Sequence, residues 1–258
     1  MTKDDLKKIA EGLLETFISA GNEALNLRKK KLKIIIKKDN TPVTNGDLAV
    51  NEKICEKIKQ ITPNIPIISE ETVNINLKNS FKNFWLIDPI DGTSDYMNNK
   101  DEFTLNAALI INLEPAIGII YAPAKDRLFY SYWEGCAFEK SNKKLIKLDN
   151  REINKKTDMV AVSNSSKPSK EILDIYKMYN VLKFTNMRSS YKFCVIASGE
   201  YDLYASSARA CEWDIAAGHA IVIHSGGSVT DHNGNKFKYA KEKYKNTNLL
   251  VKRSKKMK

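Results

Sequence analysis

The sequence predicts an α/β protein in which layers of helix and strand pack against one another. Three observations support this prediction: apolar residues at helical spacing near the N-terminus, a run of strand patterns in the middle of the chain, and alternating strand and helix patterns after it. The chain has 258 residues, of which 42% are hydrophobic, enough for one large layered domain or two smaller packed ones. We find no internal repeat.

The N-terminal part is predicted to contain two helices and three short strands. Leu6, Leu13 and Phe17 lie on one face of an amphipathic helix, and Thr44 is a candidate N-cap for the second helix. In chain order we expect a helix over residues 3–29, a strand over 32–37, a loop over 38–44, a helix over 46–60, and strands over 65–69 and 84–88.

The middle of the chain is predicted to be an antiparallel meander. Its strands are expected at 103–111, 116–121, 128–133 and 136–138, with turns at 114–115 and 121–123. The polar stretch 141–158 is expected to connect the meander to the rest.

The last part of the chain alternates between strand patterns and helix patterns. We expect strands at 159–163, 181–184, 201–204 and 228–230, and helices at 170–179, 190–197 and 213–224. A soft boundary near residue 140 divides the chain into an N-terminal α+β half, residues 1–140, and a C-terminal α/β half, residues 141–258.

The net charge of +11 raises the question of nucleic-acid binding. The distribution of charge argues against it, because lysines are spread along the whole chain and no zinc-finger or RNA-binding motif is present. The basic tail, residues 252–258, is expected to be a solvated end. We therefore expect no nucleic-acid polymer as a partner, although a positive field can attract a small anionic substrate.

The cysteines and the N-terminal sequence indicate the cellular compartment. Cys55, Cys136, Cys194 and Cys211 are scattered without a C-x-x-C pair, so we expect them to be reduced and structural. Charged residues interrupt the first ten positions, and no uncharged run is apolar enough to cross a bilayer. The expected location is the cytoplasm, with attachment to the inner face of a membrane as an alternative.

The stretch W-L-I-D-P-I-D-G-T carries a hydrophobic strand to its end and then crowds Asp88 and Asp91 into one turn. Two carboxylates this close repel unless a cation lies between them, and Mg²⁺ takes oxygen ligands. The pattern predicts a metal site, with the carbonyl of Ile90 as a further ligand and the N–H groups of Gly92 and Thr93 placed for phosphate. The alternative is an ordinary surface turn, because Asp, Pro and Gly all favour turns.

Two other acidic positions favour the metal site. Glu70 and Glu71 follow the apolar run 65–68, and Asp214 follows Trp213 at the start of an apolar helix. Each also has an ordinary interpretation, as loop charge or as an acid that complements a helix dipole. Because adjacent side chains point in different directions, Glu71 is expected beside the site or in solvent.

The histidines and the glycines match no catalytic motif. His219, His224 and His232 lack H-E-x-x-H spacing, so we assign them no role. No G-x-x-x-x-G-K-[ST] motif is present, which argues against a P-loop NTPase.

Seven segments together carry a resemblance to a known family: D-N-T-P-V-T-N-G-D-L-A-V-N-E, P-I-I-S-E-E, W-L-I-D-P-I-D-G-T-S-D-Y, E-F-T-L-N-A-A-L-I, G-I-I-Y-A-P-A, S-S-Y-K-F and E-W-D-I-A-A-G-H-A-I. In this order, over about residues 5 to 235, the chain resembles the inositol monophosphatase superfamily and, within it, the CysQ-like 3′(2′),5′-bisphosphate nucleotidases. The resemblance implies a layered αβαβα sandwich of the sugar-phosphatase type. It also implies a lithium-sensitive, Mg²⁺-dependent phosphatase of sulfur metabolism that acts as a monomer or homodimer.

The resemblance also assigns roles to individual residues. It implies two or three Mg²⁺ ions per site, held by Glu70, Asp88, the Ile90 carbonyl, Asp91 and Asp214. It makes Glu70, Thr93 and Asp47 catalytic, because Thr93 and Asp47 match the pair that orients the attacking water. In two-metal hydrolysis one ion activates this water and the other stabilises the departing ester oxygen.

Substrate choice is implied by an S-x-x-K element, Ser189 to Lys192, which in bisphosphate nucleotidases helps to hold the nucleotide; a lysine there can neutralise a second phosphate. The implied substrate-binding residues are Glu70, Ile90, Asp91, Gly92, Thr93, Ser189, Lys192 and Asp214. The chain departs from the family at Ser206, where relatives usually carry arginine, and at Ser166, where they carry histidine.

Three functions follow. The leading one is hydrolysis of the 3′-phosphate of 3′-phosphoadenosine 5′-phosphate or its sulfated form. The second is the same catalyst acting on inositol or sugar monophosphates. The third is a basic binding protein without catalysis.

Overall fold

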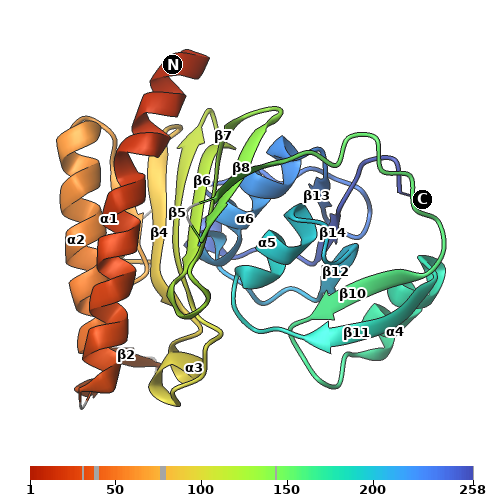
Figure 1. Cartoon of the computed structure of the whole chain (residues 1–258), viewed down its shortest axis with the longest axis horizontal. Helices are drawn as coiled ribbons and strands as arrows, with labels where there is room; N and C mark the ends of the chain where they lie inside the picture. Colours follow the sequence, from red (N-terminus) through yellow and green to blue (C-terminus); the bar gives the residue numbers. More distant parts are fainter. Residues whose placement is uncertain (31, 38–40, 76–79, 143, 258) are drawn as a thin grey trace.

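The computed structural model describes residues 1–30, 32–37, 41–75, 80–142 and 144–257. The chain forms five layers in the order helices, sheet, helices, sheet, helix (Figure 1). Helices α1 (Lys3–Lys29) and α2 (Asn45–Ile61) form the first layer, α5 (Tyr191–Ala197) and α6 (Glu212–His224) the third, and α4 (Lys170–Met178) the fifth. The predicted layered αβαβα fold is confirmed.

The first sheet has seven strands in chain order, all antiparallel except the β3–β4 pair, which is parallel. Its strands are β3 (Ile67–Ser69), β4 (Phe84–Asp91), β5 (Thr104–Ile111), β6 (Glu114–Ala122), β7 (Arg127–Trp133), β8 (Cys136–Ser141) and β9 (Lys144–Leu148). A short helix, α3 (Thr93–Met97), follows β4, and a 3₁₀ turn, Pro123–Lys125, follows β6. Strands β1 (Ile34–Ile36) and β2 (Pro42–Thr44) form a separate antiparallel pair.

The second sheet has five strands in the order β11-β10-β12-β14-β13. Its strands are β10 (Met159–Ser163), β11 (Val181–Asn186), β12 (Leu203–Ser206), β13 (Ser228–Thr230) and β14 (Leu249–Lys252). The first three strands are mutually parallel, and β14 pairs antiparallel with both β12 and β13. A 3₁₀ turn, Glu242–Tyr244, precedes β14.

Helix α2 begins as the sequence predicts, with Thr44 as its N-cap. The Thr44 hydroxyl accepts from the N–H groups of Gly46 and Asp47, and the Asp47 carboxylate accepts from the Thr44 N–H at 2.8 Å. This reciprocal capping box satisfies N–H groups that have no partner within the helix. It also fixes the carboxylate of Asp47 at the start of α2.

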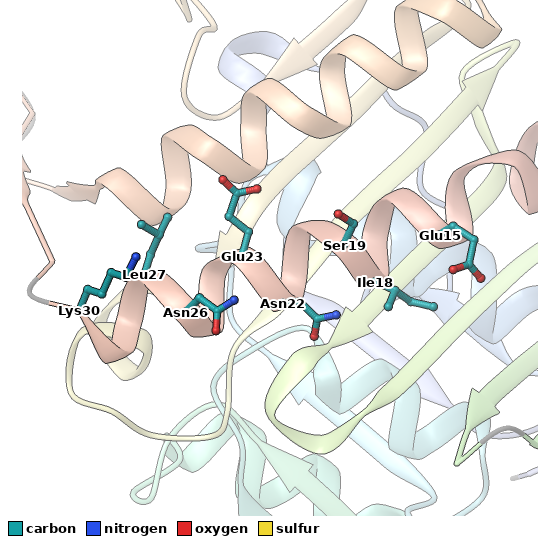
Figure 2. Close-up of a pocket in the computed structure, with 8 residues that line it drawn as sticks. All are labelled: Glu15, Ile18, Ser19, Asn22, Glu23, Asn26, Leu27 and Lys30. Atoms are coloured by element: carbon teal, nitrogen blue, oxygen red, sulfur yellow. The ribbon is translucent and has the colours of Figure 1, made fainter.

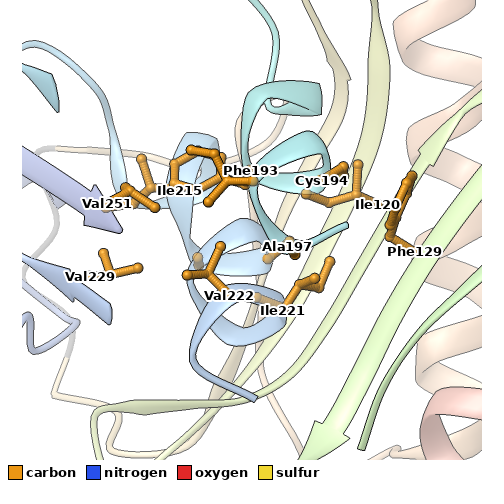
Figure 3. Close-up of a cluster of buried hydrophobic side chains, with 14 of the residues drawn as sticks. Ile120, Phe129, Phe193, Cys194, Ala197, Ile215, Ile221, Val222, Val229 and Val251 are labelled. Atoms are coloured by element: carbon orange, nitrogen blue, oxygen red, sulfur yellow. The ribbon is translucent and has the colours of Figure 1, made fainter. Parts of the chain in front are cut away.

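Strands β4 to β7 of the first sheet are buried on both faces, and their side chains alternate between two hydrophobic cores. On β4, Trp85 and Ile87 pack against α1 and α2, whereas Phe84 and Leu86 belong to the core under α5 and α6. Figure 3 shows this second core, where side chains of α5 and α6 meet those of β6 and β7 on one side and β13 and β14 on the other. Burial on both faces explains the nearly continuous apolar runs of these strands.

Helix α6 lies in close contact with the first sheet. A Cβ atom on Gly118 of β6 would lie 2.2 Å from the carbonyl oxygen of Ala217, a distance that no real Cβ contact shows. Glycine at this position therefore lets α6 approach β6 directly and sets the position of its N-terminus. No helix of the described residues is both long and apolar enough to cross a lipid bilayer.

Four expectations about the connections are wrong. Residues 114–115 and 121–122 belong to β6, and the β5–β6 turn lies instead at Asn112 and Leu113, which have positive φ angles of 52° and 65°. The expected connection over 141–158 contains β9, so the first sheet continues beyond residue 140. The expected loop over 38–44 contains β2, and its residues 38–40 lie outside the described part of the chain. The division into two halves at residue 140 stays a prediction.

The basic tail is not a solvated end. Lys252 is the last residue of β14, and the side chains of Ser254 and Met257 are completely buried. Of its described residues, 252–257, only Lys255 and Lys256 are exposed. The tail expectation was wrong because the apolar residues that anchor it, 249–251, form a strand too short to stand out as a periodic pattern.

Candidate metal centre and active site

Asp88 and Asp91 lie on the same face of the first sheet because a bulge interrupts β4 between them. In the antiparallel ladder Asp88 pairs with Asn106 and Asp91 with Thr104, so three steps on β4 match two steps on β5. Side chains alternate along a strand, and residues three apart would normally face opposite sides. The extra residue in the bulge returns Asp91 to the face that Asp88 occupies. Two residues, Pro89 and Ile90, can therefore separate two aspartates that share one site.

Glu70 reaches the same place from the neighbouring strand. It follows β3, which runs parallel to β4 with Ser69 opposite Ile87, and its N–H donates to the Ile87 carbonyl at 3.0 Å. The next residue on β4 is Asp88. The parallel pairing therefore brings the two predicted acidic strand ends together, as expected.

Asp214 comes from the opposite side of the site, in the first turn of α6. Its carboxylate accepts from the N–H of Cys211 at 2.7 Å, which closes a capping box at the start of the helix. The ordinary helix-capping role is therefore real. It occupies Oδ2 and leaves Oδ1 as the oxygen free for another ligand.

Carboxylate oxygens of Glu70, Asp88 and Asp214 all lie within 4.8 Å of one another. Asp88 is buried, and its Oδ1 has no hydrogen-bond partner among the described residues. A buried carboxylate oxygen without a partner is costly, and three oxygens at this spacing match the ligands of a hard divalent cation. These residues therefore fit Mg²⁺.

The carboxylates of the cluster hold their protons more tightly than free ones. Burial, followed by the charge of Asp214, raises the pKa of Glu70 to about 8. Burial, followed by the charge of Asp91, raises the pKa of Asp214 to about 7, and burial and Glu70 raise that of Asp88 well above its usual range. A bound divalent cation would offset these shifts, because its charge favours the ionised forms.

Thr93 lies between the predicted metal ligands and α2. Its hydroxyl is 3.0 Å from the Ile90 carbonyl and 3.3 Å from the Asp47 carboxylate, both within donating distance. Asp47 is itself buried, and burial raises its pKa. The structure thus places Thr93 and Asp47, the pair that the resemblance assigns to the attacking water, in contact with each other.

Glu71, which was expected beside the site or in solvent, is beside it. Its carboxylate pairs with the Lys37 ammonium at 2.7 Å and is almost fully buried. Burial alone would lower the pKa of Lys37, but the hydrogen bond and charge of Glu71, with smaller contributions from Glu70 and Asp47, raise it. Lys37 therefore remains charged next to the acidic cluster.

The predicted substrate residues Ser189 and Lys192 lie in the loop and first turn of α5, on the other side of the Gly92 turn. A Cβ atom on Gly92, whose φ is 92°, would lie 3.6 Å from the Cβ of Ser189. The Lys192 ammonium donates to the carbonyl oxygens of Arg188 at 3.0 Å and Ser189 at 2.8 Å. These bonds use two of the three donors of the ammonium, and Lys192 is only 7% exposed.

The two departures from the family lie at different depths. Ser206 is the last residue of β12 and is buried, whereas Ser166 follows β10 and is exposed. Neither position carries a cation.

One residue of the site was missed by sequence reasoning. Ser190 contacts both Asp91 and Asp214, although only its neighbours Ser189 and Lys192 were chosen from the S-S-Y-K-F segment. The position of Ser190 at the start of a predicted helix was visible in the sequence. Serine is so common at helix N-caps, however, that this position indicates no function.

The histidines lie away from the cluster in hydrogen bonds of their own. His219 pairs with the Tyr239 hydroxyl, His224 with the Ser131 hydroxyl, and His232 with Glu171. The groove in Figure 2 contains none of the three cluster residues, because the residues that line it belong to α1 and its C-cap, between Glu15 and Lys30. Neither feature belongs to the metal site.

Comparison with known proteins gives a family and several relatives. The model of the inositol monophosphatase family matches residues 4–258. The chain is 34% identical to the 3′(2′),5′-bisphosphate nucleotidase CysQ of Buchnera aphidicola, over 91% of this chain and 88% of the relative. It is 31% identical to the protein of that name from Escherichia coli (strain K12), over 86% and 89%.

Solved structures agree with these relatives. CysQ from Bacteroides thetaiotaomicron, a bacterial member of the inositol monophosphatase family, superposes with a TM-score of 0.75 at 28% identity, covering 94% of this chain and 96% of that one. An inositol monophosphatase from Anabaena gives a TM-score of 0.76 at 22% identity over 96% and 92%, which shows the shared fold.

Proposed function

The chain belongs to the inositol monophosphatase family, and we propose that it is a Mg²⁺-dependent 3′(2′),5′-bisphosphate nucleotidase. It would remove the 3′-phosphate of 3′-phosphoadenosine 5′-phosphate to give AMP, and that of the sulfated nucleotide to give adenosine 5′-phosphosulfate. The names of the curated relatives support this substrate class. The observation that carries the chemistry is the cluster of Glu70, Asp88 and Asp214, whose oxygens lie within 4.8 Å of one another.

The acidic residues of the cluster would hold the metal. Glu70, Asp88 and Asp214 supply carboxylates, Asp91 lies on the same face as Asp88, and the Ile90 carbonyl adds a neutral oxygen. We propose two or three ions per site. Divalent ions bound here would acidify a water and neutralise charge on the departing ester oxygen.

Thr93 and Asp47 would position the attacking water. The Thr93 hydroxyl can donate to Asp47 at 3.3 Å, which leaves its lone pairs free to accept a hydrogen bond from a water. Glu70, on the adjacent strand end, would hold the same water in line with the scissile bond. The three residues thus orient a proton and a nucleophile without a covalent intermediate.

The substrate residues would lie on the other side of the cluster. We propose that the 3′-phosphate lies against Gly92 and Thr93 and that the 5′-phosphate reaches Ser189 and Lys192. Two donors of Lys192 are held by backbone carbonyls, so its third hydrogen and its charge are what it can offer a phosphate.

A second candidate is an inositol or sugar monophosphatase. It is favoured by Ser206 and Ser166, which put no cation where relatives usually place arginine and histidine. A non-catalytic basic protein is disfavoured, because carboxylates gathered and buried without a cation only destabilise the fold.

Phosphate release from a panel of substrates tests the proposal. We expect the highest kcat/KM for 3′-phosphoadenosine 5′-phosphate, loss of activity in EDTA with recovery in Mg²⁺, and inhibition by Li⁺ at limiting Mg²⁺. A higher kcat/KM for inositol monophosphate would establish the second candidate, and absence of hydrolysis from every substrate would leave the third.

We also propose a cytoplasmic location, supported by four cysteines that are free thiols. Monomer and homodimer are both compatible with a small phosphorylated substrate.

A further inference from the structure

Ser190 stands at the junction between the two sides of the site. Its hydroxyl contacts the Asp91 carboxylate and lies 2.7 Å from the carbonyl oxygen of Asp214 and 3.3 Å from the amide nitrogen of Asn106. Its own N–H also donates to Asp91 Oδ2. One buried serine, 1% exposed, therefore joins β4, β5 and α6.

The hydroxyl is not used for capping its own helix. Ser190 is the N-cap of α5, where a serine oxygen normally accepts from an N–H of the first turn. Here the side chain makes no such bond, and the backbone of Ser190 has helical angles, with φ −63° and ψ −7°. The common structural role of an N-cap serine is thus absent.

The donors and acceptors around the hydroxyl leave little freedom. Asn106 donates to one lone pair, and the single hydroxyl proton is shared between two acceptors, Asp91 Oδ2 and the Asp214 carbonyl. Asp91 Oδ2 thus has two donors, both from Ser190. These bonds select the orientation of the carboxylate and leave Oδ1 for a cation.

We propose that Ser190 is a positioning residue for the metal site: it orients the Asp91 carboxylate and ties it to the backbone of Asp214, and it thereby sets the affinity for a divalent cation. Partners behind metal ligands act in this way, and their loss typically lowers metal affinity 10- to 100-fold. From the proposed function this inference takes only that the acidic cluster binds a metal; it does not depend on the identity of the substrate.

Direct binding of Mn²⁺, followed by the EPR signal of the free ion and without substrate, tests the inference. Mn²⁺ prefers the same oxygen ligands as Mg²⁺. We expect Ser190→Ala to raise the Kd for Mn²⁺ by about 10-fold or more and to raise the Mg²⁺ concentration for half-maximal activity by a similar factor. The KM for nucleotide at saturating Mg²⁺ should stay within about twofold, because uniform substrate binding is untouched.

Ser198→Ala provides a matched control. Ser198 is the C-cap of the same helix, where its hydroxyl contacts the Val195 carbonyl and Glu200. It should leave the Kd for Mn²⁺ unchanged. If Ser190→Ala unfolds, Ser190→Cys keeps the shape of the side chain but replaces the hydroxyl with a weak donor, and it should weaken binding in the same direction.

An unchanged Kd for Mn²⁺ in a folded Ser190 variant would overturn the inference. A higher KM for nucleotide at saturating Mg²⁺, with no change in the Kd for Mn²⁺, would also overturn the inference, because Ser190 would then act on substrate binding. A wild-type protein that binds Mn²⁺ but hydrolyses no nucleotide would refute the proposed substrate and leave the role of Ser190 intact.

Discussion

The hydroxyl of Thr93 lies 3.3 Å from the carboxylate of Asp47, although the two residues are 46 positions apart in the chain. The pair joins the turn after β4 to the first turn of α2. Because the Thr93 hydroxyl lies beside the Ile90 carbonyl, a proposed metal ligand, we expect changes to this pair to affect the chemical step.

Removal of the Thr93 hydroxyl should slow hydrolysis. Thr93→Val keeps the shape of the side chain but can neither donate to Asp47 nor accept from a water, so kcat should fall by at least about 100-fold, the lower range for proton transfer by a positioned group. Thr93→Ser retains the hydroxyl and should keep most of the activity. Equal rates in the two variants, measured by phosphate release at saturating Mg²⁺, would refute the role.

Asp91→Asn should nearly abolish hydrolysis. A neutral amide lowers the negative charge that holds a cation, while its size and its contact with the Ser190 N–H remain suitable for folding. Asp174→Asn, on exposed α4, makes the same change away from the site and should have wild-type activity. Near wild-type activity of a folded Asp91→Asn protein, verified by circular dichroism, would show that Asp91 is not a ligand.

Lys192→Ala should change selectivity between substrates. If the ammonium supplies a charged hydrogen bond to the distal phosphate, its loss raises KM for 3′-phosphoadenosine 5′-phosphate by the equivalent of about 1.5–3 kcal/mol. Hydrolysis of inositol monophosphate, which has no distal phosphate, should hardly change. Because Lys192 also binds the Arg188 and Ser189 carbonyls, an equal loss on both substrates would indicate damage to the loop and not recognition of the nucleotide.

Gly118→Ala should destabilise the fold. The new methyl group would lie 2.2 Å from the Ala217 carbonyl and 2.8 Å from the Ala220 side chain, so α6 must move away from β6. Such overpacking costs about 1–3 kcal/mol of the free energy of unfolding. Gly12→Ala on α1 meets only the flexible end of Ile61 and should be neutral or stabilising. Urea unfolding that gave both variants the same midpoint would contradict the packing argument.

The buried histidine at the end of α6 should make stability depend on pH. Burial lowers the pKa of His224 to about 4, against about 6.5 in an unfolded chain. The unfolded state therefore binds the proton first, and stability that is fully present above about pH 6.5 is lost as the pH falls toward 4. At pH 5 the loss from this group is about 2 kcal/mol relative to pH 8.

His224→Gln removes this titration while keeping a polar group beside Ser131. Between pH 8 and pH 5 the unfolding free energy of the wild type should fall by about 2 kcal/mol more than that of the variant, because titrating groups that do not interact with His224 contribute equally to both proteins. Parallel pH profiles of the two proteins would refute the assignment.

The elements that the sequence predicted well are those whose side chains repeat over several turns or strand steps. The helix that ends at Lys29 and the meander over β5 to β8 have such patterns, whereas the Thr44 cap was predicted from its residue type. The short strands β9 and β14 were missed because their stability comes from neighbours in a sheet and not from local periodicity.

That Glu70, Asp88 and Asp214 gather in one place could be predicted from acids at two strand ends and at a helix start, because crowded carboxylates need a cation. Their role as metal ligands, and that of Asp91, stays a prediction. What the sequence could not reveal was the bulge that turns both aspartates to one face, or the hydrogen bonds that converge on Ser190. These depend on register between strands and on contacts between distant segments, which a single sequence does not specify.

If the cluster of Glu70, Asp88 and Asp214 binds Mg²⁺ as proposed, the folded state is itself a magnesium-binding state. The three residues come from the end of β3, from β4 and from the start of α6, so the unfolded chain has no such site, and each bound ion would pull the equilibrium toward the native fold. At a concentration 100 times the Kd, one ion adds about 2.7 kcal/mol to the free energy of unfolding. Magnesium depletion would then shorten the lifetime of the protein as well as stop its chemistry, because cellular proteases degrade the unfolded chain.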